Sequence, residues 1–123
     1  MVKQQTKSEV MSIIVSTFPS EQSIANIIKD LIATKKLCAC VSLTKVRSVY
    51  QWNGKLEDQQ EFIAFFKTTK MCAERLKDEI KKVHPYEVPE ILEIKVDYVS
   101  ESYLSWMMQN TATTTKSDTI SRK

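Results

Sequence analysis

Apolar residues repeat with a strand-like and then a helical spacing at the start of the chain. Residues 10–16 (VMSIIVS) form a short apolar run that is typical of a buried strand. Ser20 then precedes an apolar stripe with the i, i+3, i+4 spacing of one helix face, made of Ile24, Ile27, Ile28, Leu31 and Ile32. The pattern predicts a strand followed by a helix that Ser20 caps.

Two long strand-like segments follow, covering residues 38–52 and 55–68, and Asn53-Gly54 separates them. Asn-Gly is the favoured sequence for a two-residue type I′ hairpin turn. Such a turn pairs Gln51 with Leu56, Tyr50 with Glu57 and Val49 with Asp58. The half of the hairpin near the turn is polar and the base is apolar, so the hairpin is longer than the core beneath it, which indicates an oligomer.

A second helix, a last strand and a short helix complete the pattern. Thr68 or Thr69 is expected to cap the second helix, which ends at His84 because Pro85 disfavours helical backbone in the residue before it. Residues 92–98 alternate as a half-exposed strand, and Ser100 is expected to cap the last helix. The order predicts an α+β fold, a ferredoxin-like βαββαβ sandwich with a long hairpin between its second and third strands and a C-terminal helix.

Charge and composition help to define the expected domain and exclude some classes of function. The 123 residues carry a net charge of +3, but the excess lies in a polar N-terminal segment, 1–9, and a polar tail, 109–123, that is expected to be disordered. The expected domain, 10–108, is electrically balanced, so we predict no binding to nucleic acid. The single glycine excludes glycine-rich phosphate loops.

The sequence also bears on location. No apolar run is long enough to span a membrane, and the N-terminal residues lack a signal-peptide core. We therefore expect a cytoplasmic protein without membrane partners, with the cysteines reduced.

The residues that could carry chemistry are few. His84 is the only histidine, and it is a candidate metal ligand or a residue that satisfies the end of a helix. The cysteines Cys38, Cys40 and Cys72 suit core packing or a soft metal. Aromatic residues that favour pocket walls or interfaces are Tyr50, Trp52, Tyr86, Tyr103 and Trp106, and candidate paired carboxylates are Glu57, Asp58, Glu61, Glu87 and Glu90. No nucleophile, base and acid occur in a convincing order, so we do not expect an enzyme.

Four segments resemble, in order and spacing, the signature blocks of the CutA family of divalent-cation tolerance proteins. They are residues 50–57 (YQWNGKLE), 66–69 (FKTT), 84–90 (HPYEVPE) and 103–106 (YLSW). The resemblance covers roughly residues 10–108. It implies a ferredoxin-like subunit in a homotrimer similar to PII signalling proteins, with the long hairpin paired to neighbouring subunits. It also implies a role in tolerance to copper and other divalent cations through metal binding.

The resemblance implies two kinds of site. His84 is the metal candidate, and Ser16 and Val83 stand where bacterial members have a cysteine and a second histidine, so copper binding is expected to be weak. A second set combines aromatic walls with charges, as small-ligand pockets do: Trp52, Glu57, Lys67, Tyr86, Glu90 and Trp106. The alternative function is a PII-like trimeric signalling module that binds a small anionic metabolite between subunits, with Lys67 contacting its charge.

Overall fold

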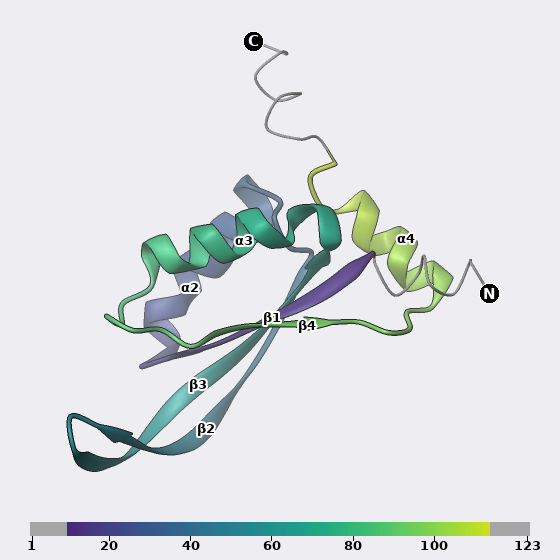
Figure 1. The fold of residues 1–123 in the computed structure, drawn as a ribbon. Coiled ribbons are helices and arrows are strands. Elements are labelled where there is room, and N and C mark those ends of the chain that lie inside the picture. The colour runs from purple at the N-terminus through teal and green to yellow at the C-terminus, as the bar shows by residue number, and fades with distance from the viewer. Residues whose placement is uncertain (1–9, 114–123) are drawn as a thin grey trace.

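A four-stranded antiparallel sheet carries α2 and α3 on one face (Figure 1). The computed structural model describes residues 10–113. The elements are β1 (Met11–Phe18), α2 (Glu21–Lys29), η1 (Asp30–Thr34), β2 (Cys40–Trp52), β3 (Lys55–Thr69), α3 (Lys70–Val83), β4 (Ile91–Lys95) and α4 (Glu101–Gln109). The strands lie in the order β2-β3-β1-β4, and each neighbouring pair is antiparallel. The predicted ferredoxin-like α+β fold is therefore confirmed.

Local side-chain chemistry sets the helix ends. Ser20 caps α2, because its Oγ accepts a hydrogen bond from the backbone N–H of Ser23 at 3.2 Å. Thr69 caps α3 in the same way through the N–H of Cys72 at 3.3 Å. His84 leaves the helical conformation with a ψ of 136°, as expected before Pro85.

Two elements differ from the sequence prediction. The single helix expected after Ser20 continues from α2 into a π-helical turn, η1, which a regular apolar spacing does not reveal. The strand expected over residues 92–98 covers only Ile91–Lys95. Its partner β1 begins at Met11, whose carbonyl accepts the N–H of Val96 at 3.1 Å, so the pairing of the two strands ends where β1 begins.

The core lies between the sheet and the two helices. Ile14, Phe18 and Phe66 project from the sheet and are fully buried against Leu76 and Ile80 of α3. Cys38 and Cys72 belong to this core, which confirms the packing interpretation for these two thiols. Cys40 is only partly buried at the start of β2.

The packed chain continues past residue 108, where the sequence analysis placed the end of the domain. α4 ends at Gln109, and Thr111 is buried. The N–H of Ala112 donates to the carbonyl of Lys36 at 2.7 Å, and the Sγ of Cys72 donates to the carbonyl of Ala112 at 3.2 Å. Residues 1–9 and 114–123, which hold the rest of the expected polar segments, lie outside the described residues.

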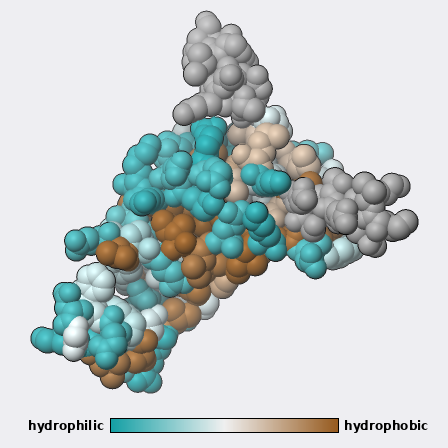
Figure 2. All heavy atoms as spheres, viewed as in Figure 1, coloured by the Kyte–Doolittle hydropathy of each residue, from teal (hydrophilic) through white to brown (hydrophobic). Residues whose placement is uncertain are grey.

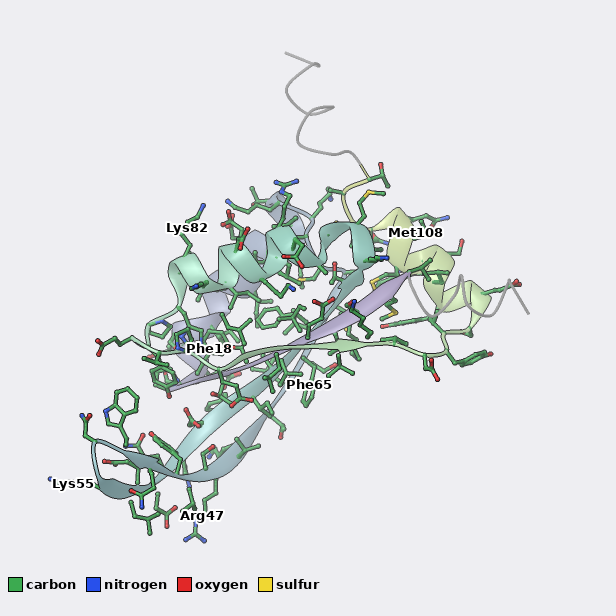
Figure 3. All side chains as sticks on the ribbon, in the orientation of Figure 1. Phe18, Arg47, Lys55, Phe65, Lys82 and Met108 are labelled. Carbon is green, nitrogen blue, oxygen red and sulfur yellow. The ribbon has the colours of Figure 1, made fainter. Side chains whose placement is uncertain are left out.

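The other sheet face is apolar, and α4 covers only its end at Met11, which packs with Met107. Ile13, Phe65, Leu92 and Ile94 occupy matching positions on the strands, opposite to the alternation that points Ile14 and Phe66 into the core. In Figure 3, Phe65 lies on the side of the sheet away from α2 and α3. Leu92 and Ile94 are 52% and 50% exposed. Figure 2 shows hydrophobic atoms gathered below the helical layer. We call the residues Ile13, Val15, Ile63, Phe65, Leu92 and Ile94 the open sheet face.

The hairpin has the predicted register. Gln51 pairs with Leu56, Tyr50 with Glu57 and Val49 with Asp58. Asn53 and Gly54 both have positive φ, 52° and 76°, as a type I′ turn requires. β1 pairs only with residues 62–69 of β3, so the outer half of the hairpin extends beyond the rest of the sheet.

Candidate functional site

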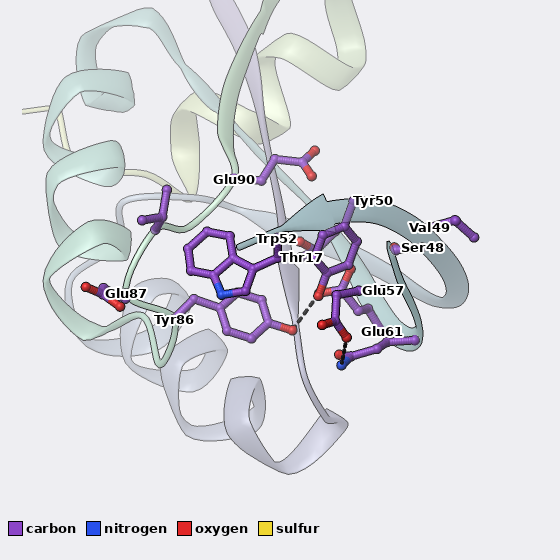
Figure 4. Close-up of a pocket in the computed structure, with 12 residues that line it drawn as sticks. Thr17, Ser48, Val49, Tyr50, Trp52, Glu57, Glu61, Tyr86, Glu87 and Glu90 are labelled. Carbon is purple, nitrogen blue, oxygen red and sulfur yellow. Dashed lines mark hydrogen bonds between the residues drawn. The ribbon is translucent and has the colours of Figure 1, made fainter. Parts of the chain in front are cut away.

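A cleft of about 670 Å³ lies between the outer half of the hairpin and the loop that joins α3 to β4 (Figure 4). β1 ends at Phe18, so residues 55–61 of β3 have β2 on one side and no strand on the other. The loop of residues 84–90 crosses this open side, where Tyr86 reaches Glu61. The hairpin contributes Tyr50, Trp52, Glu57 and Glu61 to the lining, and the loop contributes Tyr86, Glu87, Val88 and Glu90.

The cleft is acidic. Its twelve lining residues include four glutamates and neither a lysine nor an arginine. Carboxylates gathered around a partly enclosed space create a negative potential that attracts cations and repels anions. The arrangement can therefore concentrate a positively charged ligand.

Glu61 links the two walls of the cleft. Glu61 is only 5% exposed, and its Oε2 accepts a hydrogen bond from the hydroxyl of Tyr86 at 2.5 Å. Burial raises the pKa of Tyr86, and the hydrogen bond and negative charge of Glu61 raise it further. Tyr86 thus stays protonated and donates to Glu61 throughout the physiological pH range.

His84 holds the base of the loop through hydrogen bonds at both of its ring nitrogens. The backbone N–H of Tyr86 donates to Nδ1 at 3.1 Å, so Nδ1 carries no proton. The hydroxyl of Ser16 donates to the carbonyl of Glu90 at 2.7 Å and lies 3.0 Å from Nε2, so the neutral ring donates from Nε2 to Ser16. Phe18 stacks on the ring with the two centroids 4.3 Å apart.

These contacts leave His84 poorly suited to bind a metal. The lone pair that would bind copper is on Nδ1, and it already accepts the N–H of Tyr86. Burial lowers the pKa of His84, although a hydrogen bond to the backbone of Thr17 and the charge of Glu61 oppose this effect, so the ring is neutral at pH 7. Its surroundings give it the role of a loop-positioning residue.

The cysteines do not complete a metal site either. Burial, together with the charges of Cys40 and Cys72, raises the pKa of Cys38 to about 12, so this thiol stays protonated at neutral pH. A metal binds the thiolate form. Across residues 10–113, no three or more histidine, cysteine or acidic side chains come together in a way that could hold a metal ion. The described residues of one chain therefore do not fit a tight copper centre.

The cleft brings together four of the predicted ligand-binding residues: Trp52, Glu57, Tyr86 and Glu90. Lys67 lies elsewhere, on β3, and its Nζ donates to the Oγ of Ser42 at 3.0 Å. Trp106 stacks on Tyr103 within α4, with the centroids 5.6 Å apart. One chain therefore does not assemble the anion pocket of the alternative interpretation.

Three further cleft residues, Tyr50, Glu61 and Glu87, were candidates by residue type only. The alternation of a strand puts Tyr50 on the same side of β2 as Trp52, and the hairpin register puts Glu61 on the same side of β3 as Glu57. The contact between Glu61 and Tyr86 joins residues far apart in the chain, and no local pattern predicts it.

Comparison with known proteins agrees with this architecture. Residues 12–110 match the family described as CutA1 divalent ion tolerance protein. The divalent-cation tolerance protein CutA of Pyrococcus horikoshii is 42% identical over 101 residues, which cover 82% of this chain and 98% of that protein. The CutA of Thermotoga maritima is 37% identical over 100 residues, covering 81% of this chain and 98% of that protein.

Solved structures of these proteins share the fold. The crystal structure of CutA1 from Pyrococcus horikoshii superposes with a TM-score of 0.79 at 40% identity, covering 82% of this chain and 98% of that chain. CutA from Archaeoglobus fulgidus, described as periplasmic, gives 0.77 at 32% identity, covering 81% and 97%. Within residues 10–113, no helix has the length and apolar character needed to cross a membrane. The chain belongs to the CutA1 divalent ion tolerance family.

Proposed function

We propose that this chain acts in divalent-cation tolerance as a homotrimeric, non-enzymatic binding protein, and that its binding site is the acidic cleft. The observation that carries the proposal is the cleft lining, with four glutamates and no basic residue. Carboxylate oxygens bind divalent cations, and their number and convergence set the affinity. Because no three such donors converge among residues 10–113, the expected binding of a divalent cation is weak.

This proposal assigns metal binding to the carboxylates and not to the predicted ligand His84. Glu57 is the most informative of them, because it faces the cleft from β3. Among the described residues, its only hydrogen bond between side chains is a long one, 3.4 Å, from Gln59. A cation that binds Glu57 has no strong internal partner to displace. Binding at Nδ1 of His84 costs the hydrogen bond from Tyr86.

Calorimetric titration of Cu(II) into the wild-type chain, Glu57→Gln and His84→Ala tests this assignment. We expect Glu57→Gln to weaken binding at least about tenfold, or about 1.4 kcal/mol. Asp97→Asn, which removes one charge outside the cleft, is the matched control and should bind as the wild type does. Electron paramagnetic resonance of the bound copper should show oxygen ligands only. Nitrogen hyperfine splitting that disappears in His84→Ala would show that His84 binds the metal and would contradict the assignment to the carboxylates.

The open sheet face supports assembly into a trimer. Its exposed apolar residues, Leu92 and Ile94, lie beside Val15 and Ile13 of β1, and Val15 in turn pairs with Phe65 of β3. Soluble monomers rarely expose a large contiguous apolar patch, and obligate interfaces often exceed about 2,000 Å² in total. The outer edge of β2 also lacks a strand partner within the described chain, and a neighbouring copy would cover it.

Light scattering of Leu92→Lys tests the assembly. We expect the wild type to have the mass of a trimer and Leu92→Lys to dissociate at micromolar concentration. Met71→Lys, at a residue of α3 that is 55% exposed against 52% for Leu92, is the control and should remain trimeric. A wild-type chain that is monomeric at the same concentration would contradict the proposal.

Three predictions from the sequence concern properties beyond a single chain: two are ligand contacts that need the assembly, and the third is the location in the cell. Lys67 has the same strand parity as the open sheet face, so it could contact a ligand only where neighbouring copies meet. Trp106 on α4 is likewise a ligand contact only if another copy brings a cleft to it. The cytoplasmic location is retained as part of this proposal.

A further inference from the structure

We propose that the cleft is a binding site for a small organic ammonium cation, which Tyr50, Trp52 and Tyr86 surround and the glutamates attract. The inference rests on the proposed cation-binding role of the cleft and specifies the chemical class of its ligand. It reverses the sign of charge expected for a metabolite from the sequence. The proposed ligand is an organic cation, so it differs in chemical class from the divalent metal ions of the proposed function.

Aromatic rings form the walls of the cleft. Tyr50 and Trp52 are two residues apart on β2, so both project from the same side of the hairpin, and Tyr86 faces them from the loop (Figure 4). Tyr50 is 38% exposed and Trp52 43% exposed, so their rings are open to a ligand. The electron-rich face of an aromatic ring attracts a cation, and tryptophan is the strongest partner.

The size of the cleft favours an organic ligand. Its volume of about 670 Å³ lies within the range of roughly 300–1,000 Å³ that small-molecule sites occupy. A bare divalent cation instead needs several oxygen donors converging at about 2.0–2.6 Å, and the described residues bring no three such donors together. Rings combined with dispersed carboxylates suit a bulky, weakly hydrated cation better.

The carboxylates give the ligand its charge selectivity. Glu61 lies beside Tyr86 at the buried end of the cleft, and Glu57 follows the hairpin wall next to Tyr50. Glu90 faces the same space from the loop. An anion of the same size would meet this negative potential without a lysine or arginine among the lining residues to balance it.

A pair of isosteric probes tests the proposal. Choline and its uncharged isostere 3,3-dimethylbutan-1-ol are titrated into the full chain by calorimetry, with EDTA present to remove metals, and tetramethylammonium is titrated as a smaller cation. We expect choline or tetramethylammonium to bind with a Kd of about 1 mM or tighter, and the neutral alcohol at least about tenfold more weakly. Equal binding of choline and the alcohol, or no binding of either cation at 50-fold higher concentration, would overturn the proposal.

Matched variants locate the site. Trp52→Ala should weaken choline binding at least about tenfold, and Trp52→Phe, which keeps a ring, should recover part of the loss. Tyr98→Ala is the control, because Tyr98 is an aromatic residue that is 74% exposed and lies outside the cleft, and it should bind choline as the wild type does. Loss in Tyr98→Ala with retention in Trp52→Ala would place the cation elsewhere and contradict the assignment.

The metal titration distinguishes this inference from the proposed function. Choline binding without Cu(II) binding would retain the organic-cation site and remove the metal from the cleft. Cu(II) binding that Glu57→Gln weakens, without choline binding, would retain the proposed function and reject the organic cation. If both bind, choline should compete with Cu(II), because both are assigned to the same cleft.

Discussion

Replacing Tyr86 with phenylalanine removes one hydroxyl group and keeps the aromatic ring that lines the cleft. In the wild type this hydroxyl donates to Oε2 of Glu61, a residue that is only 5% exposed. Glu61 cannot recover full hydration at such a position, so the substitution leaves a buried acceptor without its donor. The cost should therefore come mainly from desolvation of the carboxylate.

The expected loss can be bracketed from this geometry. Hydrogen bonds to charged groups contribute about 1.5–3 kcal/mol, and the bond between Tyr86 and Glu61 joins segments 25 positions apart in the sequence. We expect Tyr86→Phe to lower the free energy of unfolding by about 2 kcal/mol. Glu61→Gln should cost about 1 kcal/mol, because the amide carbonyl still accepts the hydroxyl of Tyr86 but carries no charge.

Urea unfolding at pH 7 and fixed protein concentration measures both substitutions and the double variant. A coupling energy of about 1 kcal/mol or more in this double-mutant cycle is the expected result. Absorbance titration of the tyrosines supplies a second measurement. The Glu61→Gln variant should shift one tyrosine to a lower pKa, because the pKa of Tyr86 is then no longer raised by the hydrogen bond and charge of the carboxylate.

Two results would refute the reasoning. If Tyr86→Phe unfolds within about 0.5 kcal/mol of the wild type, the carboxylate is not held buried by this hydroxyl. If the double variant is additive, the two residues do not interact in solution, and the loop does not close on the hairpin as described. Tyr98→Phe is the control, because Tyr98 is 74% exposed and outside the cleft, and it should have no effect.

Three further predictions follow from single contacts. Burial lowers the pKa of His84 in the fold, so the neutral ring stabilises the fold fully above the unfolded pKa near 6.5, and this contribution is lost as the pH falls toward the folded pKa. Urea unfolding between pH 7 and pH 5 should therefore show a loss of stability of up to about 1.4 kcal/mol per pH unit, and His84→Gln should lack it. Lys77→Met should lower the free energy of unfolding by about 1–2 kcal/mol at pH 7, because Lys77 donates to the half-buried Glu93 at 2.6 Å and, with Ser12, lowers the pKa of Glu93. The difference from the wild type should shrink as the pH falls below 4.5 and Glu93 is protonated. Gly54→Ala should cost about 1 kcal/mol in thermal or urea unfolding, from the positive φ of 76° alone, because an added Cβ meets no atom within 4 Å.

The hairpin shows how far the sequence can predict the fold. Asn53-Gly54 has one favoured turn geometry, and that turn determines every pairing along the two strands. Helix caps at Ser20 and Thr69 are equally local, since a hydroxyl and an N–H three residues later form them. Such features depend on neighbouring residues and are accessible without a structure.

The end of β4 and the cleft depend on distant partners. β4 stops at Lys95 because β1 begins at Met11, and nothing near Lys95 in the sequence carries that information. The residues of the cleft were candidates by type, but their common location follows from the crossing of the loop over β3. The sign of its charge could not be predicted, because Lys67 on the same strand lies outside the cleft and Glu61 lies within it.

The position of His84 decides how its variants should be interpreted. Its ring joins Ser16 of β1 to the backbone of Tyr86, and Tyr86 in turn reaches Glu61 of β3. His84→Ala therefore loosens one wall of the cleft as well as removing an imidazole. Loss of Cu(II) binding in that variant alone would be the same whether the ring binds copper or positions the loop. The nitrogen hyperfine signal of the wild type separates the two roles, because only direct coordination produces it. A wild-type spectrum with oxygen ligands alone, together with weaker binding in His84→Ala, would identify His84 as the residue that positions the cleft and the carboxylates as the groups that meet the cation.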